Sequence, residues 1–212
     1  MSIIDDAPDC RKLISLDTVN AYRKLIIQDF SRIWEINDAA HRIEHFLDVE
    51  KCGNYINDKL ELGFDPLLIM LVAFFHDMYA WDRHNHHHMS AEWVLTCDNK
   101  VIGVLSDQHR QMVAAGCREH RASGNKPFTC DFAEMMCSAD RGFPTTDPEV
   151  LLKRAVQHRM HTYNISEVVA RPGAIEHIKE KYGKGGYARY PDMYKRAFAD
   201  EFLAQQEAIA RL

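Results

Sequence analysis

Apolar residues recur at helical spacing along much of the chain, and the stretch from residue 38 to 60 shows this clearly. Five apolar side chains recur there at roughly the period of one helix face: Ala40, Ile43, Leu47, Ile56 and Leu60. Asp38 is a suitable N-cap, because its side chain can accept a hydrogen bond from the first turn. We therefore predict a helix over 38–60, ended by Gly63 and by Asp65-Pro66.

A more uniformly apolar segment follows, from Pro66 to about Met78, with the sequence PLLIMLVAFFHDM. Proline fits the first position of a helix, where its missing N–H is not needed. A buried strand is the alternative, but the length and the Leu, Met and Ala content favour a helix. A helix this apolar is expected to lie buried at the centre of the domain.

Polar and aromatic residues from Tyr79 to His88 predict a loop, and a helix is expected to start near Ser90. Cap and breaker residues predict the later helices: Ser106-Asp107 through Cys117, Asp131 to Asp140, Asp147-Pro148 through Tyr163, a short segment from Pro172-Gly173 to Gly183, and Asp192 to Leu212. No segment alternates convincingly like a strand. We predict an all-α fold, a compact bundle of roughly seven to nine helices.

The 212 residues suit one domain, with a core over about 35–145 and a helical extension over about 146–212. No apolar run approaches the roughly 20 residues of a membrane span. The acidic opening MSIIDDAPDCRKLISL does not resemble a signal peptide, so a cytoplasmic protein is expected. The six cysteines form no CxxC pair, and neither disulfides nor a zinc finger are expected.

The formal net charge of −5, with dispersed basic residues, argues against a nucleic-acid surface. Histidine is the unusual component, because most of the 12 histidines fall between His41 and His120. Histidine is the commonest metal ligand and proton carrier near neutral pH. Composition thus directs attention to a metal or acid–base site in that part of the chain.

Potential ligands stand at the edges of three predicted helices. His41 and His45 are four residues apart, hence on one face of their predicted helix. The pair His76-Asp77 and the single Asp140 each close an apolar helix, where a charge needs compensation such as a bound cation. Mixed histidine and carboxylate ligands suit a divalent ion (Mn, Co, Ni, Fe, Zn or Mg) with positions left open for water and phosphate oxygens.

In order, the segments HRIEHFLDV, AFFHDMYAW and SADRGF resemble the H...HD...D pattern of the HD superfamily, and the resemblance covers roughly residues 35 to 145. It is nearest to the small stand-alone bacterial and phage HD hydrolases that act on nucleotides. The resemblance implies His45, His76, Asp77 and Asp140 as ligands of one metal ion per chain, with His41 outside the ligand set. It also implies metal-assisted attack of water on phosphorus, with Asp77 orienting that water.

The segment WDRHNHHHMS, directly after the His-Asp pair, is either a solvated loop or a source of residues that protonate a leaving oxygen or hold phosphate. We select Asp82 and His88 as catalytic candidates and Arg83 as a phosphate contact. Glu119 and His120 end another helix, and either can act as a general acid or a substrate contact. A second metal through His88 and His120 is the alternative, although the fuller histidine set of two-metal HD phosphodiesterases is not evident.

Basic residues near these positions suggest phosphate contacts. Arg141 follows Asp140, where it can neutralise a phosphate or pair with a neighbouring acid. The glycine-rich segment YGKGGYARYP is a solvated loop or a phosphate clamp, of which Lys184 is the selected residue. We place His41, Arg83, Arg141 and Lys184 in the expected substrate-binding set.

The expected function is hydrolysis of a nucleotide, a (deoxy)nucleoside mono- or triphosphate, by a protein that is compatible with a homodimer. A phosphodiesterase for cyclic nucleotides or alarmones is the nearest alternative, because the same centre with a second metal could support it. A metal-bound binding module without turnover and a di-iron oxygenase are alternatives of other classes. The intact ligand set argues against the former and the scarcity of extra ligands against the latter.

Overall fold

The computed structural model describes residues 15–38, 41–124 and 126–212 of the chain. Every regular element in these residues is a helix, which confirms the predicted all-α class. Ten helices are described, more than the predicted seven to nine. The N-terminal segment, with Cys10, and the predicted apolar position Ala40 lie outside the described residues. The five cysteines within the described residues form no disulfide with one another.

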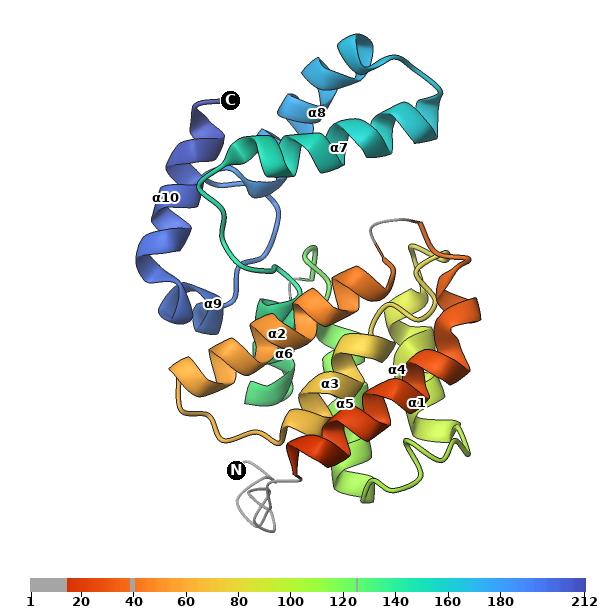
Figure 1. The fold of residues 1–212 in the computed structure, drawn as a ribbon. Coiled ribbons are helices and arrows are strands. Elements are labelled where there is room, and N and C mark those ends of the chain that lie inside the picture. Colours follow the sequence, from red (N-terminus) through yellow and green to blue (C-terminus); the bar gives the residue numbers. More distant parts are fainter. Residues whose placement is uncertain (1–14, 39–40, 125) are drawn as a thin grey trace. The chain divides into compact units, whose positions relative to one another are not determined.

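The chain divides into two compact units, Met1–Gly142 and Phe143–Leu212, where a single domain with an extension from about residue 146 is predicted. The first unit contains α1 (Leu16–Trp34), α2 (Ile43–Lys59), α3 (Pro66–Phe75), α4 (His86–Thr96), α5 (Asp107–Glu119) and α6 (Asp131–Ala139) (Figure 1). Among the described residues, no helix is long and apolar enough to cross a membrane.

Helix α3 lies at the centre of the first unit, as its apolar sequence predicts. All nine residues from Leu67 to Phe75 are buried, and the helix packs against α1, α2, α5 and α6. Asp65 caps it by accepting a hydrogen bond from the Leu67 N–H, and Pro66 occupies its first turn. The buried apolar helix therefore ends with His76 and Asp77 held deep inside the unit.

Helix α1 is an element that the apolar pattern did not predict. Ser15 caps it by accepting from the Thr18 N–H, and its buried side chains are Val19, Ile26, Phe30 and Trp34. The Phe30 ring meets the Phe75 ring edge to face at 5.2 Å. Charged, polar and further apolar residues lie between these four positions, so the sequence does not clearly mark which face of the helix is buried.

The starts of α2 and α4 differ from the predicted ones. Helix α2 begins at Ile43 with Arg42 in the N-cap position, so Asp38 is not its cap and His41 precedes the helix. Helix α4 begins at His86 rather than near Ser90. The preceding turn is the reason, because the backbone carbonyl of Asp82 accepts from the His86 N–H at 2.9 Å and leads directly into the helix.

Two glycines allow close approach to α3. A Cβ on Gly53 of α2 would lie 2.8 Å from the Ile69 side chain, and a Cβ on Gly116 of α5 would lie 2.9 Å from the Val72 side chain. Real side chains do not tolerate such distances, so any larger residue would push the helices apart. Both contacts lie in the core around α3.

The second unit contains α7 (Pro148–Tyr163), α8 (Glu167–Tyr182), α9 (Asp192–Ala197) and α10 (Ala199–Ala210). The predicted break at Pro172-Gly173 is wrong, because both residues lie inside α8 and the chain turns at Asn164, which adopts left-handed backbone angles. Phe198 divides the predicted final helix into α9 and α10. The unit has its own core of Leu152, Val156, Ala170, Ala174, Ile178 and Ile209.

Candidate metal centre

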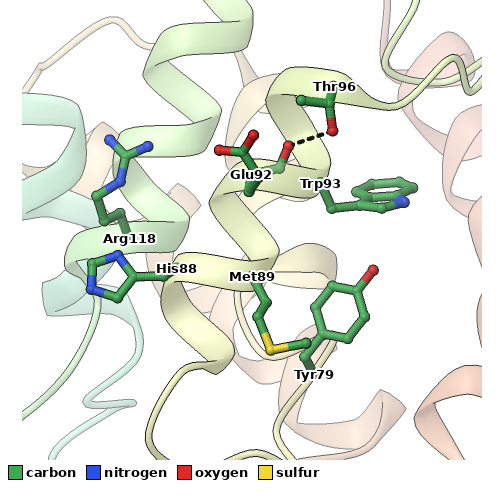
Figure 2. A pocket seen from close by; sticks show the side chains of 7 residues that line it. All are labelled: Tyr79, His88, Met89, Glu92, Trp93, Thr96 and Arg118. Carbon is green, nitrogen blue, oxygen red and sulfur yellow. Dashed lines mark hydrogen bonds between the residues drawn. The ribbon is translucent and has the colours of Figure 1, made fainter.

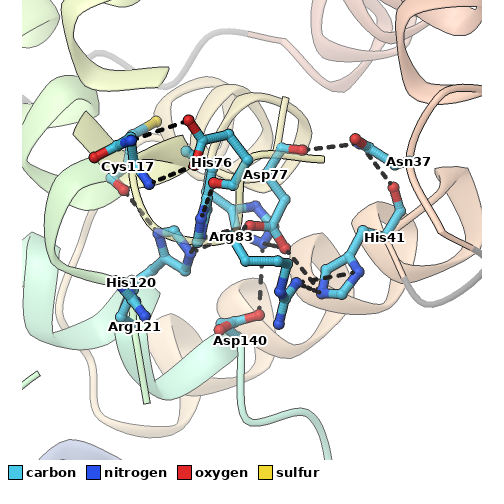
Figure 3. A network of polar contacts seen from close by, with 12 residues as sticks. Asn37, His41, His76, Asp77, Arg83, Cys117, His120, Arg121 and Asp140 are labelled. Atoms are coloured by element: carbon cyan, nitrogen blue, oxygen red, sulfur yellow. Dashed lines mark hydrogen bonds and ion pairs between the residues drawn. The ribbon is translucent and has the colours of Figure 1, made fainter. Parts of the chain in front are cut away.

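Helix ends of the first unit bring six histidine and aspartate side chains together. His45 lies in the first turn of α2 and His86 in the first turn of α4. The other four directly follow or lie close to the ends of α3, α5 and α6: His76, Asp77, His120 and Asp140. Figure 3 shows the last four converging from three different helices.

Four of these residues form what we call the first cluster: His45, His76, Asp77 and Asp140. The Nε2 atoms of His45 and His76 lie 3.2 Å apart. The Asp140 Oδ1 atom is 3.3 Å from the first and 3.5 Å from the second of these nitrogens. The Asp77 Oδ2 atom is 3.4 Å from His76 Nε2 and 3.7 Å from His45 Nε2. The structure thus brings together the four residues that the resemblance indicates.

Asp77 also belongs to a second cluster, with His86 and His120. Its Oδ1 atom lies 3.3 Å from the Nε2 atom of each histidine, and these two nitrogens are 3.3 Å apart. All three side chains are buried. The two clusters adjoin, because the His76 and His120 rings meet edge to face at 4.8 Å.

The imidazoles are oriented by backbone carbonyls on the side away from the clusters. The Nδ1 atoms of His76 and His120 lie 2.9 Å from the Ala73 oxygen and 2.7 Å from the Cys117 oxygen, respectively. His86 Nδ1 lies 3.3 Å from the Asp82 oxygen. A carbonyl only accepts, so each Nδ1 atom carries a proton and Nε2 is the nitrogen that faces the cluster, as in metal-binding histidines.

The residues present fit divalent cations. Two neutral imidazoles cannot hydrogen-bond through two facing lone pairs, yet the Nε2 atoms of His86 and His120 face each other in this way in the second cluster. Asp77 Oδ1 is buried and has no hydrogen-bond partner among the described residues. Buried polar atoms without partners are costly, and a cation bound between them would remove that cost.

The charge states favour cation binding. Burial opposes ionisation of Asp77 and Asp140, but nearby positive charge outweighs it. His76 holds the pKa of the Asp77 carboxyl, and Arg141 the pKa of the Asp140 carboxyl, well below the usual range. Burial lowers the pKa of His86 to about 4, so its ring is neutral at pH 7. Burial also acts to lower the pKa of His76, but the two carboxylates overcome it and raise the pKa to about 10. A metal ion at the first cluster would displace that proton.

Arg141 links the two clusters rather than facing solvent. Its Nη2 group hydrogen-bonds to the Asp140 carboxylate and, at 3.0 Å, donates to the backbone oxygen of His120. Its side chain is only 6% exposed. The expected role as a phosphate contact is therefore replaced by the other role considered, pairing with a neighbouring acid.

Asn37 is a buried residue that the sequence did not indicate. Its amide nitrogen donates to the backbone oxygens of His41 and Asp77, at 3.2 and 3.0 Å, and its oxygen accepts from the Trp81 N–H at 3.1 Å. It is 1% exposed. One side chain therefore joins the connection between α1 and α2 to the turn that follows α3, beside the first cluster.

Three expected catalytic residues lie outside both clusters. The Asp82 carboxylate accepts from the N–H groups of His84 and Asn85, each at 3.1 Å, and stabilises the turn before α4. Glu119 accepts from the backbone N–H and the hydroxyl of Thr129, at 2.9 and 2.7 Å. Both carboxylates thus hold local chain segments.

His88 is exposed and lies with Arg118 and Trp93 around an open hollow of about 600 Å³ (Figure 2). The alternative in which His88 shares a second metal with His120 is wrong, because α4 starts earlier than predicted and turns His86 inward instead. Lys184 lies in the second unit, between α8 and α9.

Comparisons with protein-family models, curated proteins and solved structures found no significant match to this chain.

Proposed function

We propose that this protein is a metal-dependent phosphohydrolase that binds two divalent cations, one at each cluster. The observation that carries the proposal is Asp77, whose two carboxylate oxygens face two separate groups of buried ligand atoms. A carboxylate shared in this way is suited to bridge two ions. The order of HRIEHFLDV, HD and SADRGF, which resembles the HD superfamily, supports the same assignment.

The first cluster would hold its ion through His45, His76, Asp77 and Asp140, and the second through Asp77, His86 and His120. Imidazole and carboxylate ligands suit Mn²⁺, Fe²⁺, Co²⁺, Ni²⁺ or Zn²⁺. When bound, such ions lower the pKa of water and neutralise phosphate charge. The backbone carbonyls behind the histidines would keep the ligand nitrogens directed at the ions. Arg141 connects the Asp140 carboxylate to the backbone oxygen of His120 and so fixes their relative position.

The proposed substrates are nucleotides, with a (deoxy)nucleoside mono- or triphosphate as the first candidate. The second cluster also favours a phosphodiester substrate, a cyclic nucleotide or an alarmone, because two adjacent ions can stabilise both the attacking and the leaving oxygen. A binding module without turnover is disfavoured by the completeness of both clusters.

A substrate screen tests the activity. Protein loaded separately with Mn²⁺, Co²⁺, Ni²⁺, Fe²⁺ or Zn²⁺ is mixed with common nucleotides and cyclic dinucleotides, and phosphate, pyrophosphate and linear products are measured. We expect hydrolysis of at least one substrate and its loss in Asp77→Ala, since that residue serves both clusters. Absence of every product, or activity that survives Asp77→Ala, contradicts the proposal.

Metal analysis of a matched pair of variants tests the second ion. His86 and His88 stand two residues apart on α4, but only His86 reaches Asp77. We expect about two equivalents of metal in the native protein and in His88→Ala, and about one in His86→Ala. Equal metal content in the two variants would show that His86 is not a ligand.

A further inference from the structure

Building on the proposed function, we infer that Arg83 binds the phosphoryl group of the substrate and that Asp38 and His41 hold Arg83 in position. These three residues lie beside the first cluster, and none of them belongs to it. They come from two segments that are far apart in sequence, the connection between α1 and α2 and the turn before α4. Arg83 would thus contact the substrate directly, in addition to the cations held by the two clusters.

A chain of two hydrogen bonds connects the three side chains. His41 Nδ1 lies 2.6 Å from Asp38 Oδ1, and Arg83 Nη1 lies 2.8 Å from His41 Nε2. Arginine has only donors, so His41 Nε2 must accept and the ring proton must be on Nδ1, where it is donated to Asp38. Figure 3 shows the Arg83 guanidinium directed at the His41 ring.

This arrangement gives His41 a role different from that of a ligand. Its Nε2 atom is 3.7 Å from Asp77 Oδ2, so the ring lies at the edge of the first cluster. Its lone pair is nevertheless used by Arg83. Asn37 also holds the backbone oxygen of His41, which keeps the ring in place. His41 is therefore a positioning residue for Arg83.

The position of Arg83 favours an anion in front of it. The residue is exposed, and it forms no ion pair with a carboxylate of the described residues. Its positive charge would stand close to the two proposed cations, and these like charges repel one another unless an anion lies between them. The planar guanidinium can direct two parallel N–H groups at two oxygens of a phosphate. A phosphoryl group bound to the cations and to Arg83 would place negative charge between the like charges, and its oxygens would accept from the N–H groups of Arg83.

Binding of inorganic phosphate to the metal-loaded protein tests the inference by calorimetry. We expect Arg83→Gln to weaken phosphate binding by about tenfold or more, as for the loss of a charge-assisted hydrogen bond, while metal content stays native. Arg83→Lys should lose less, because it keeps the charge without the planar fork. Arg118→Gln is the matched control in the same unit and should bind phosphate as the native protein does.

A double variant tests the positioning role. Asp38→Asn should weaken phosphate binding in the native background, because it disturbs the orientation of His41. It should have no further effect in the Arg83→Gln background, because the residue it positions is already gone. An equal effect of Asp38→Asn in both backgrounds would overturn the positioning role.

Native phosphate affinity in Arg83→Gln with full metal content overturns the inference, and so does an absence of phosphate binding by the native metal-loaded protein. The proposed function fails separately, through an absence of product in the substrate screen. Arg83-dependent phosphate binding without hydrolysis would therefore remove the enzyme proposal and keep the anion site.

Discussion

Asn37 shows how one uncharged side chain can organise a charged site. It is buried and uses its amide on the backbone oxygens of His41 and Asp77, while its oxygen holds the Trp81 N–H. These backbone groups lie on two segments that are far apart in sequence, the connection between α1 and α2 and the turn that follows α3. Removing the amide would leave buried donors and acceptors unsatisfied, which costs more than the net value of the hydrogen bonds themselves.

We expect Asn37→Ala to lower the free energy of unfolding by about 2 to 4 kcal/mol, since up to three hydrogen bonds are lost and their partners stay buried. Metal affinity should fall as well, because the backbone of Asp77 is released. Urea denaturation and metal titration measure the two effects.

Asn54→Ala is the control, because the Asn54 amide makes one hydrogen bond within α2, to the Glu50 oxygen. It should cost less stability and leave metal affinity unchanged. Equal losses in both variants would mean that Asn37 has no particular relation to the site.

The sequence predicted the first cluster better than its surroundings. His76, Asp77 and Asp140 stood out because each ends an apolar helix, a place where a charged group is unexpected. His86 was missed because three consecutive histidines offer no way to tell which one faces inward until the start of α4 is known. Asn37 was missed because its importance arises from burial, and an asparagine near a helix end is ordinary in sequence.

At the scale of elements, the close packing of α5 on α3 depends on Gly116. A methyl group there would meet the Val72 side chain at 2.9 Å. Overpacking of this kind typically costs about 1 to 3 kcal/mol. The contact matters for the site because α3 and α5 end in residues of the two clusters.

We therefore expect Gly116→Ala to destabilise the protein by about 1 to 3 kcal/mol. Val72→Ala alone should also be destabilising, because it leaves a cavity. The double variant should be more stable than the sum of the single effects predicts, because the new methyl group occupies the space left by valine. Additive effects, measured by urea denaturation, would contradict this account of the contact.

Helix boundaries were predicted unevenly, and local chemistry explains the difference. Asp65-Pro66 and Asp147-Pro148 marked real helix starts, because each combines a capping carboxylate with a proline that fits the first turn. Pro172 gave a false break, because α8 accommodates it in its interior. The real turn is at Asn164, which adopts a left-handed conformation. Asparagine tolerates this conformation, but an asparagine in the sequence does not by itself predict it.

At the scale of the whole molecule, all residues of both clusters belong to the first of the two compact units. The three tryptophans of the chain, Trp34, Trp81 and Trp93, belong to it as well. Tryptophan fluorescence therefore reports the unfolding of the metal-binding unit separately from the second unit.

We expect Mn²⁺ to raise the thermal midpoint of the fluorescence transition, because an ion that binds only the folded state stabilises it by mass action. One site occupied at about a hundred times its dissociation constant contributes about 2.7 kcal/mol. Asp77→Asn should show little of this increase, since Asp77 is shared by both clusters. The same Mn²⁺-dependent increase in both proteins would place the stabilising ion elsewhere.

The central position of α3 affects the time scale on which the backbone of the proposed metal ligands His76 and Asp77 moves. Its residues are buried and surrounded by four other helices, so its amides should exchange with deuterium only when the whole first unit opens. His76 and Asp77 continue directly from this helix. We therefore expect the shared carboxylate to be attached to a slowly exchanging part of the first unit, where an ion would meet a backbone already held in place.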